Sequence, residues 1–355
     1  QLVCARTVQG LGGSLMLPLG RFIILRTFKR HELVQAMSSV IMVVSIGVML
    51  GPLVGGIITD QLSWSWIFWV NIPVGILAIL MTSRFLKPVA PKKVKPLDFI
   101  GFILFGGGLA ALTFALSDLS ESTASETIAL TILCTAIAML SFYFYRAKKQ
   151  VNPIIDLNLF SIRTFRISVF GNLCARLGFG GVPFLLPLLL QVGLGYSAQL
   201  SGLLLMPLAI GNLLVKAVSL PVMRWVGFRR LLMVNTFLVG FALWLFLLVN
   251  QTTPLVIIAA FTFCFGFLIS LQYSGMNSLA YADITPEQHG SATSIMSTMQ
   301  QIAQSFGVAM SALLLRFFSS LNGQNFPLTT TVFHHAFLAL SFFIYVDRRS
   351  SEDAF

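Results

Sequence analysis

Runs of about twenty apolar residues, separated by short polar connections, recur along the whole of this chain. A helix of that length crosses the hydrocarbon core of a bilayer, which is about 30 Å thick. Only 10% of the 355 residues are charged, whereas a soluble domain has about a quarter. The chain is therefore predicted to be an all-α polytopic membrane protein. The eleven predicted spans are 1–20, 33–59, 66–84, 98–117, 127–145, 167–192, 201–222, 231–249, 254–281, 291–317 and 332–346.

Lysine and arginine residues are concentrated in one alternating set of the connections between these runs, although 282–290 in that set contains none. Nineteen of the 23 lie there or in the C-terminal tail, and the other connections contain none. Cytoplasmic connections of membrane proteins are the ones enriched in these residues. The basic connections and the C-terminus are therefore predicted to be cytoplasmic. The predicted outer connections are 60–65, 118–126, 193–200, 250–253 and 318–331.

The sequence contains none of the motifs expected of an enzyme. There is no Walker motif, no HExxH and no C-x-x-C, so an ion gradient is the predicted energy source for any transport. The net charge of +11 comes from residues that flank the spans, so no nucleic-acid partner is predicted. No disulfide, metal site or cofactor is predicted either, because the four cysteines lie far apart in apolar runs.

A compound glycine motif lies in the second apolar run. Gly47, Gly51 and Gly55 are spaced four apart, so they form a bare ridge on one helix face that permits close packing of a second helix. Pro52 removes a backbone donor and bends the helix beside the ridge, and Gly56 completes the motif. The pattern GxxxGPxxGG resembles the fifth-helix signature of antiporters in the major facilitator superfamily. The resemblance implies a close contact between two bundles, and an ordinary packing motif is the alternative.

The first span contains an arginine in a strongly apolar helix, where a charge is costly and needs a partner. Arg6 is followed by Gln9 and Gly10 in the pattern RxxQGxGG. This pattern resembles the fourth-helix signature of drug:proton antiporters, and the resemblance implies that Arg6, with Gln9 and Gly10 beside it, takes part in proton coupling. The alternative is an arginine that extends to the outer membrane interface.

The segment 152–165 resembles the linker before the C-terminal bundle of fourteen-span drug:proton antiporters of the EmrB/QacA type. With the two helix signatures in the expected order, the resemblance implies that the eleven spans are helices four to fourteen and that the first three are missing from this chain. The implied domains are the rest of an N-terminal bundle (1–84), two inserted spans (85–150), an amphipathic inner linker (151–166), a six-helix C-terminal bundle (167–347) and a cytoplasmic tail (348–355).

An internal repeat supports a two-bundle carrier. When the chain is shifted by 256 positions, Gly51 aligns with Gly307 and Gly55 aligns with Ser311. Both helices then carry a ridge of small residues at the same register, as expected of two bundles related by duplication.

Two polar pairs lie near mid-depth in adjacent predicted spans. Asn172 and Arg176 are four residues apart, as are Asn212 and Lys216, so each pair shares one helix face. Polar residues at that depth in a transporter usually line the transport pathway. The sequence therefore predicts that these four residues line a substrate cavity. The alternative is that they hold helices together.

Gln272 and Tyr273, in span 254–281, are predicted to extend the same cavity, although a structural role is an equal alternative. We find no Asp or Glu deep inside any span. A cavity lined by Arg176 and Lys216 without a carboxylate repels cations, because like charges interact strongly at low dielectric. Anionic, zwitterionic or neutral amphiphiles are the favoured substrates.

The family resemblance implies a proton-coupled secondary transporter that exports small amphiphilic compounds across a bacterial inner membrane. Its implied partners are the substrate, the proton and the lipid bilayer, and a periplasmic adaptor protein is left open. The rival interpretation is a truncated, non-transporting membrane protein or a scaffold subunit of a larger assembly.

Overall fold

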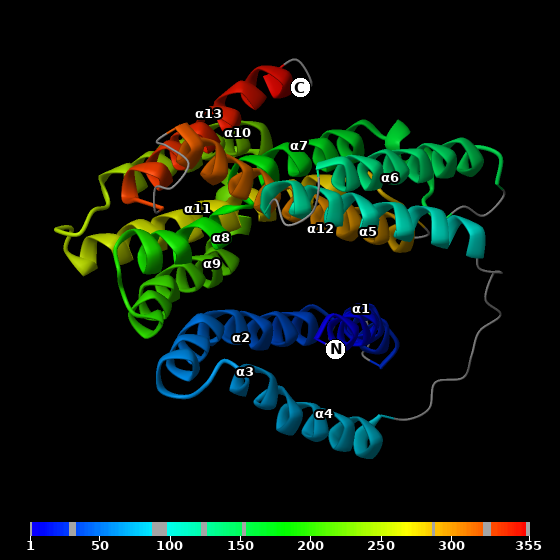
Figure 1. Cartoon of the computed structure of the whole chain (residues 1–355). Helices are drawn as coiled ribbons and strands as arrows, with labels where there is room; N and C mark the ends of the chain where they lie inside the picture. The colour runs from blue at the N-terminus through cyan, green and yellow to red at the C-terminus, as the bar shows by residue number, and fades with distance from the viewer. Residues whose placement is uncertain are drawn as a thin grey trace. The chain divides into compact units, whose positions relative to one another are not determined.

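The computed structural model describes residues 2–27, 33–86, 98–121, 126–150, 154–285, 288–321 and 328–352. Every regular element in these ranges is a helix, which confirms the all-α prediction (Figure 1). The chain divides into two compact units, Gln1–Gly51 and Pro52–Phe355.

The first unit contains α1 (Leu2–Thr27) and the first part of α2 (Leu33–Gln61). The boundary between the units falls inside α2, just before Pro52, the proline within that helix. Proline at this position removes a hydrogen bond from the helix ladder.

The second unit contains the remaining helices. They are α3 (Trp66–Trp69), α4 (Asn71–Phe85), α5 (Phe99–Glu121), α6 (Glu126–Ala147), η1 (Leu157–Ser161), α7 (Arg163–Phe179), α8 (Val182–Leu188), η2 (Leu189–Gly193), α9 (Ala198–Val226), α10 (Phe228–Leu245), η3 (Phe246–Leu248), α11 (Leu255–Ala280), α12 (His289–Leu321) and α13 (Thr330–Glu352).

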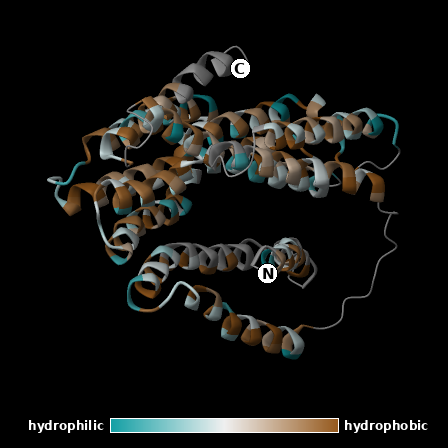
Figure 2. Ribbon diagram, viewed as in Figure 1, coloured by the Kyte–Doolittle hydropathy of each residue, from teal (hydrophilic) through white to brown (hydrophobic). Residues whose placement is uncertain are grey.

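Each of the eleven predicted spans falls on one helix of the two units or on consecutive helices. In the described part of the chain, seven helical segments are long and apolar enough to cross a membrane. Figure 2 shows hydrophobic residues, in brown, along these helical segments. Several helices extend beyond the predicted spans: α5 continues to Glu121 and α12 to Leu321, both into predicted outer connections, and α13 continues to Glu352, into the predicted tail. The exact number of crossings stays a prediction.

The span predicted as continuous over 167–192 is broken. Helix α7 ends at Phe179, and α8 begins at Val182 after Gly180 and Gly181. The next segment, η2, is a π-helix, and Pro187 lies just before it. Prolines and π-helical turns are common causes of helix distortion. The break is therefore encoded locally by small residues and prolines.

Helices α7 to α13 pack around one apolar core in the second unit. The most extensive contact joins α9 and α11, and α7 contacts α11, α12 and α13. Gly211 and Gly266 allow the α9–α11 crossing, since a Cβ at either position would collide with the backbone of the facing helix. The core includes fully buried Phe246 and Phe337, whose rings stack with centroids 5.4 Å apart.

The hairpin of α5 and α6 packs on this group through α12. A second apolar cluster joins the hairpin to the start of α7 and to α12; its buried members include Tyr143, Leu159, Phe165 and Ile295. The predicted linker segment is therefore packed between the hairpin and the helices that follow it.

Two hydrogen bonds join residues whose connections are predicted to lie on the same side of the membrane. The Asp60 carboxylate accepts from the backbone amide of Gln199 at 2.7 Å, and both residues lie in predicted outer connections. Thr164 donates to the Asp283 carboxylate at 2.9 Å, and both lie in predicted inner connections. These contacts fit the predicted alternation of sides.

Candidate functional site

Arg176 lies in the last turn of α7, beside the break in the helix. Its Nη1 atom donates to Oε1 of Gln304 at 3.1 Å, and its Nε atom donates to Oδ1 of Asn172 at 3.4 Å. The guanidinium carbon lies 3.9 Å from the ring centroid of Tyr273, a cation–π arrangement. Helices α7, α11 and α12 thus converge on one half-buried cation whose partners in these contacts are all neutral.

Gln304 connects Arg176 to the helix break. While its Oε1 atom accepts from Arg176, its Nε2 atom donates to the carbonyl oxygen of Gly180 at 2.6 Å. Breaking a helix frees backbone groups that need partners in a membrane interior. The Gln304 side chain satisfies one of them and so holds the break and the cation in one fixed arrangement.

Small residues bring α12 against the break. A Cβ at Gly307 would collide with the backbone of Arg176, Gly180 and Gly181. A Cβ at Gly181 would collide with Ser311 and with the carbonyl oxygen of Gly307. The downstream ridge predicted from the internal repeat therefore packs on the broken helix.

Asn172 has an incomplete set of hydrogen bonds. Its side chain is 2% exposed, and its Nδ2 atom is buried without a partner among the described residues. The orientation of the amide is determined by Arg176, because the Nε donor requires the oxygen on its side. A buried N–H group without an acceptor costs about 1–3 kcal/mol. An acceptor supplied by a ligand would remove that cost.

The second predicted pair lies apart from this cluster. Lys216 is exposed on α9, and Asn212 is partly buried there, with its backbone carbonyl accepting from Ser270 Oγ at 3.0 Å. Within the described residues, no hydrogen bond or ring contact joins either side chain to Arg176. The structure thus brings together Asn172, Arg176 and Tyr273 but not the two α9 residues.

Gln272 is placed in a different polar group, between α10 and α11. Its Oε1 atom accepts from Asn235 at 2.8 Å, and its Nε2 atom donates to Thr236 at 3.0 Å. Asn235 also donates to the carbonyl oxygen of Leu268 at 2.9 Å. With the side chain 2% exposed and both ends bonded, Gln272 joins two helices. This placement fits the structural alternative, and the role of Gln272 in the cavity stays a prediction.

The predicted coupling residues lie together on α1. Arg6 is exposed and donates from Nη1 to Oε1 of Gln9 at 2.8 Å. Gly10 is the next residue of the same helix. The arginine is therefore hydrogen-bonded to the residue that the family pattern places beside it.

Among the described residues, the C-terminal end of the glycine motif packs closely against α9. A Cβ at Gly56 would collide with the carbonyl oxygen of Ala198, and a Cβ at Gly202 would collide with that of Pro52. The end of α2 therefore crosses the start of α9 at backbone contact distance. Gly55 lies on the same stretch with no described side-chain or backbone atom within 4 Å of a Cβ built there. Gly47 and Gly51 belong to the first unit.

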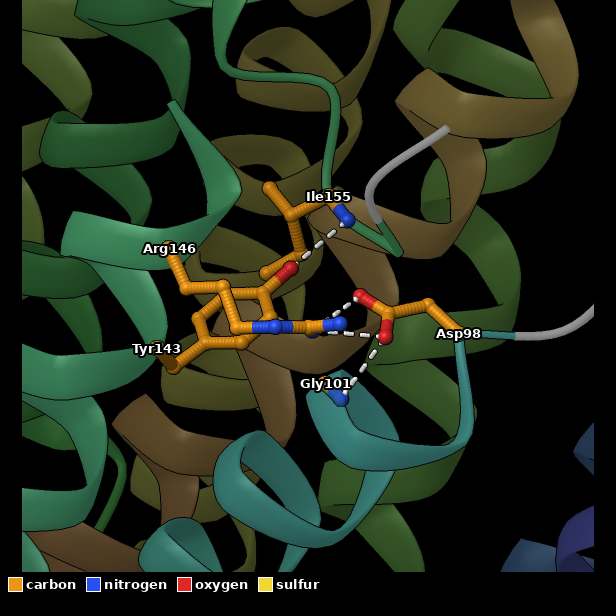
Figure 3. Close-up of polar contacts among 5 residues, drawn as sticks. All are labelled: Asp98, Gly101, Tyr143, Arg146 and Ile155. Atoms are coloured by element: carbon orange, nitrogen blue, oxygen red, sulfur yellow. Dashed lines mark hydrogen bonds and ion pairs between the residues drawn. The ribbon is translucent and has the colours of Figure 1, made fainter. Parts of the chain in front are cut away.

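A second arginine site joins α5, α6 and the linker (Figure 3). Asp98 precedes α5, and Nη1 of Arg146 contacts its two carboxylate oxygens at 2.6 and 2.9 Å. The backbone amide of Gly101 also donates to Asp98, at 3.0 Å. Asp98 lies just before the apolar stretch Phe99–Ala115. The hydrogen bond from the Gly101 amide, and to a smaller extent that from Arg146, holds the pKa of the Asp98 carboxyl below its usual value. Beside it, Tyr143 Oη accepts from the Ile155 amide at 3.0 Å.

Sequence reasoning did not assign a role in the site to Gln304 or pair Asp98 with Arg146. The glutamine lies 128 residues from Arg176, and the acid lies 48 residues from its partner. For Gln304 an available signal was its place as a polar residue beside the small-residue ridge of α12. For Asp98 the signal was an acid directly before an apolar run, which is typical of a helix N-cap.

Comparison with known proteins identifies a family and several relatives. A family model described as Major Facilitator Superfamily matches residues 1–308. The "Probable transport protein HsrA" of Haemophilus influenzae is 33% identical over 343 residues, which is 97% of this chain and 74% of that protein. The "Putative multidrug resistance protein MdtD" of Cronobacter sakazakii is 34% identical over 315 residues, 89% of this chain and 67% of that protein. The protein with the same description from Escherichia coli O157:H7 is 32% identical over 346 residues, 97% of this chain and 73% of that protein.

Proposed function

This chain belongs to the Major Facilitator Superfamily, and we propose that it is a proton-coupled secondary transporter that exports small amphiphilic compounds. Membership of this family makes it a multi-pass membrane transport protein rather than an enzyme. The relatives named as multidrug resistance proteins support export of varied small molecules. The proposed location is a bacterial inner membrane with the C-terminus in the cytoplasm, as the distribution of basic residues predicts.

The observation that carries the proposal is the Arg176 site at the broken helix. Binding sites of secondary transporters lie near the bilayer midplane and are typically formed by discontinuous helices. Here the break at Gly180, the cation of Arg176 and the buried donor of Asn172 occur together. We therefore assign the substrate cavity to Asn172, Arg176 and Tyr273, with Gln304 added. Asn212 and Lys216 stay candidates for a separate part of the pathway.

Arg6, Gln9 and Gly10 are proposed to couple transport to proton movement. The hydrogen bond between Arg6 and Gln9 supports this assignment, because it places a polar pair on an apolar helix. Charged residues within membrane helices usually mark ion or proton pathways.

The glycine motif is proposed to form the contact on which the two bundles move. The backbone crossing of Pro52 and Gly56 with the start of α9 supports this role, since bare helix faces permit sliding contacts without side-chain obstruction. The proposed bundles keep the predicted limits, with 85–150 as inserted spans and 167–347 as the C-terminal bundle. A periplasmic adaptor stays an open prediction.

The test is the accumulation of labelled amphiphilic compounds in cells that express the full-length protein, with and without a proton uncoupler. Expression should lower accumulation, and the uncoupler should abolish that difference. Arg6→Ala should lose uncoupler-sensitive export but keep exchange of labelled for unlabelled compound. Arg316→Ala is the matched control, because this exposed arginine lies near the end of α12. Unchanged accumulation of every compound would favour a non-transporting scaffold, and export insensitive to the uncoupler would contradict proton coupling.

A further inference from the structure

Hydrogen-bond donors outnumber acceptors around the guanidinium of Arg176. A guanidinium has about five N–H donors, and contacts with described residues use one on Nε and one on Nη1. The Nδ2 amide of Asn172 adds a buried donor without an acceptor among those residues. The groups that contact the guanidinium are the amide oxygens of Asn172 and Gln304 and the ring of Tyr273, none of which is charged. Such a site attracts an anion and repels a cation.

We propose that Arg176 and Asn172 bind an anionic oxygen group, such as a carboxylate, on the transported molecule. The inference rests on the proposed function, because it names the substrate chemistry of the same site. A carboxylate presents two oxygens that match the fork of guanidinium N–H groups. It would supply the counter-charge that the described neighbours of Arg176 lack, and it would accept from Asn172 as well.

Tyr273 determines the direction from which the anion reaches Arg176. Its ring covers one face of the guanidinium, and Phe179 packs against that ring with centroids 5.6 Å apart. The N–H groups point outward in the guanidinium plane, so the anion binds at an edge rather than on a face. The edge that includes Nη2 is the available one, because Nη2 contacts no described residue, whereas Nε donates to Asn172 and Nη1 donates to Gln304.

Binding at that edge leaves the helix break intact. Gln304 uses the opposite nitrogen, Nη1, and continues to donate to the carbonyl oxygen of Gly180. The anion therefore does not compete with Gln304 for the same donor. Gln304 is a positioning residue that holds the cation in place while the other edge is occupied.

The experiment uses the purified full-length protein in proteoliposomes and three derivatives of one fluorescent aromatic compound, bearing a carboxylate, a carboxamide or an amine. The wild-type protein should favour the carboxylate over the amine. Arg176→Gln should lower carboxylate transport by about tenfold or more, because one charge-assisted contact is lost. Carboxamide transport should fall by less, because the neutral amide loses a hydrogen bond but no charge pairing. Arg176→Lys keeps the charge without the fork and should give an intermediate loss.

Gln304→Glu provides an independent variant that keeps the arginine. A carboxylate at this position pairs with Arg176 and should remove the preference for the carboxylate derivative. Gln301→Glu is the matched control: it adds the same charge on the same helix, where the side chain is exposed, and should leave the preference unchanged. Size-exclusion profiles of every variant show whether it is folded. If Arg176→Gln does not fold, the carboxylate preference of Gln304→Glu tests the inference.

Two results would overturn the inference. One is an equal loss of all three derivatives in Arg176→Gln, and the other is a carboxylate preference that survives Gln304→Glu. Failure of the wild type to transport any derivative contradicts the proposed function instead, and binding of the carboxylate derivative to detergent-purified protein then tests the inference directly.

Discussion

Two arginines in the second unit, Arg146 and Arg176, occupy contrasting sites. Arg146 contacts both oxygens of Asp98, and that carboxylate is also held by the amide of Gly101 (Figure 3). Arg176 contacts two amide oxygens and an aromatic ring. The first arginine has its counter-charge within the protein and joins α5 to α6. The second has only neutral described partners, so its charge is available to a ligand.

The same contrast separates two buried amides. Gln272 is bonded at both ends and joins α10 to α11. Asn172 is bonded through its oxygen alone, and its nitrogen is buried without a described acceptor. A satisfied polar group stabilises the fold, whereas an unsatisfied one is costly unless a ligand completes it. Oδ1 of Asn235, in the Gln272 group, is also buried without a described partner. The unbonded nitrogen of Asn172 therefore supports the proposed site only together with the neighbouring cation of Arg176.

Gly307→Ala should produce the largest effect, because the Arg176 site depends on a close helix crossing at this glycine. The added methyl group would meet the backbone of α7 and the break, which cannot yield as a flexible side chain can. Overpacking of this kind costs about 1–3 kcal/mol or more. We expect a lower melting temperature and loss of transport, measured by thermal size-exclusion and by export. Gly106→Ala on α5 is the control, since no described atom lies within 4 Å of the new Cβ; equal behaviour of both variants would contradict the crossing.

Gln272→Leu should be the next most destabilising change. It removes the acceptor of Asn235 and a donor to Thr236 within a buried group, at a cost of about 1–3 kcal/mol. Substrate preference should be unchanged, because the side chain faces α10 rather than Arg176. Thermal unfolding and the transport of compounds of different charge provide the two measurements. A changed preference at unchanged stability would return Gln272 to the cavity.

Asp98→Asn should lower stability by less, because Arg146 is partly exposed and water can replace part of the lost pair. The pKa of Asp98 is lowered in the folded protein. The stabilisation is therefore present above the pKa of an unfolded aspartate, about 4, and is lost as the pH falls through the folded value. Melting temperatures of wild type and variant should differ at neutral pH and converge in acid. A difference that persists unchanged in acid would contradict the ion pair.

Asn172→Leu should have the smallest effect on stability and still impair transport. It removes a buried donor that has no described acceptor and loses only the long 3.4 Å bond from Arg176, so the melting temperature should stay the same or rise. Export of carboxylate compounds should fall by about threefold to tenfold, the loss expected of one hydrogen bond. A fall in stability similar to that of Gln272→Leu would show that Asn172 is structural and would remove the contrast between the two amides.

Local patterns in the sequence predicted much of the fold. The apolar runs predicted where helices lie, the i, i+4 spacing placed Asn172 and Arg176 on one face, and the internal repeat marked Gly307 and Ser311 as a packing ridge. These features need only residues that are close in the chain, because the thickness of the bilayer sets span length and the helical period sets which residues share a face.

The tertiary structure alone decided which polar residues meet. Gln304 joins Arg176 across 128 positions, Gln272 turns to α10, and Lys216 lies away from the guanidinium. Such pairings depend on the rotation and register of each helix against its neighbours, which arise from packing of whole helix faces. The sequence by itself determined that this chain is built from membrane helices with an arginine among them. Packing determined that the described partners of this arginine are neutral, and the proposed anion site is inferred from that arrangement.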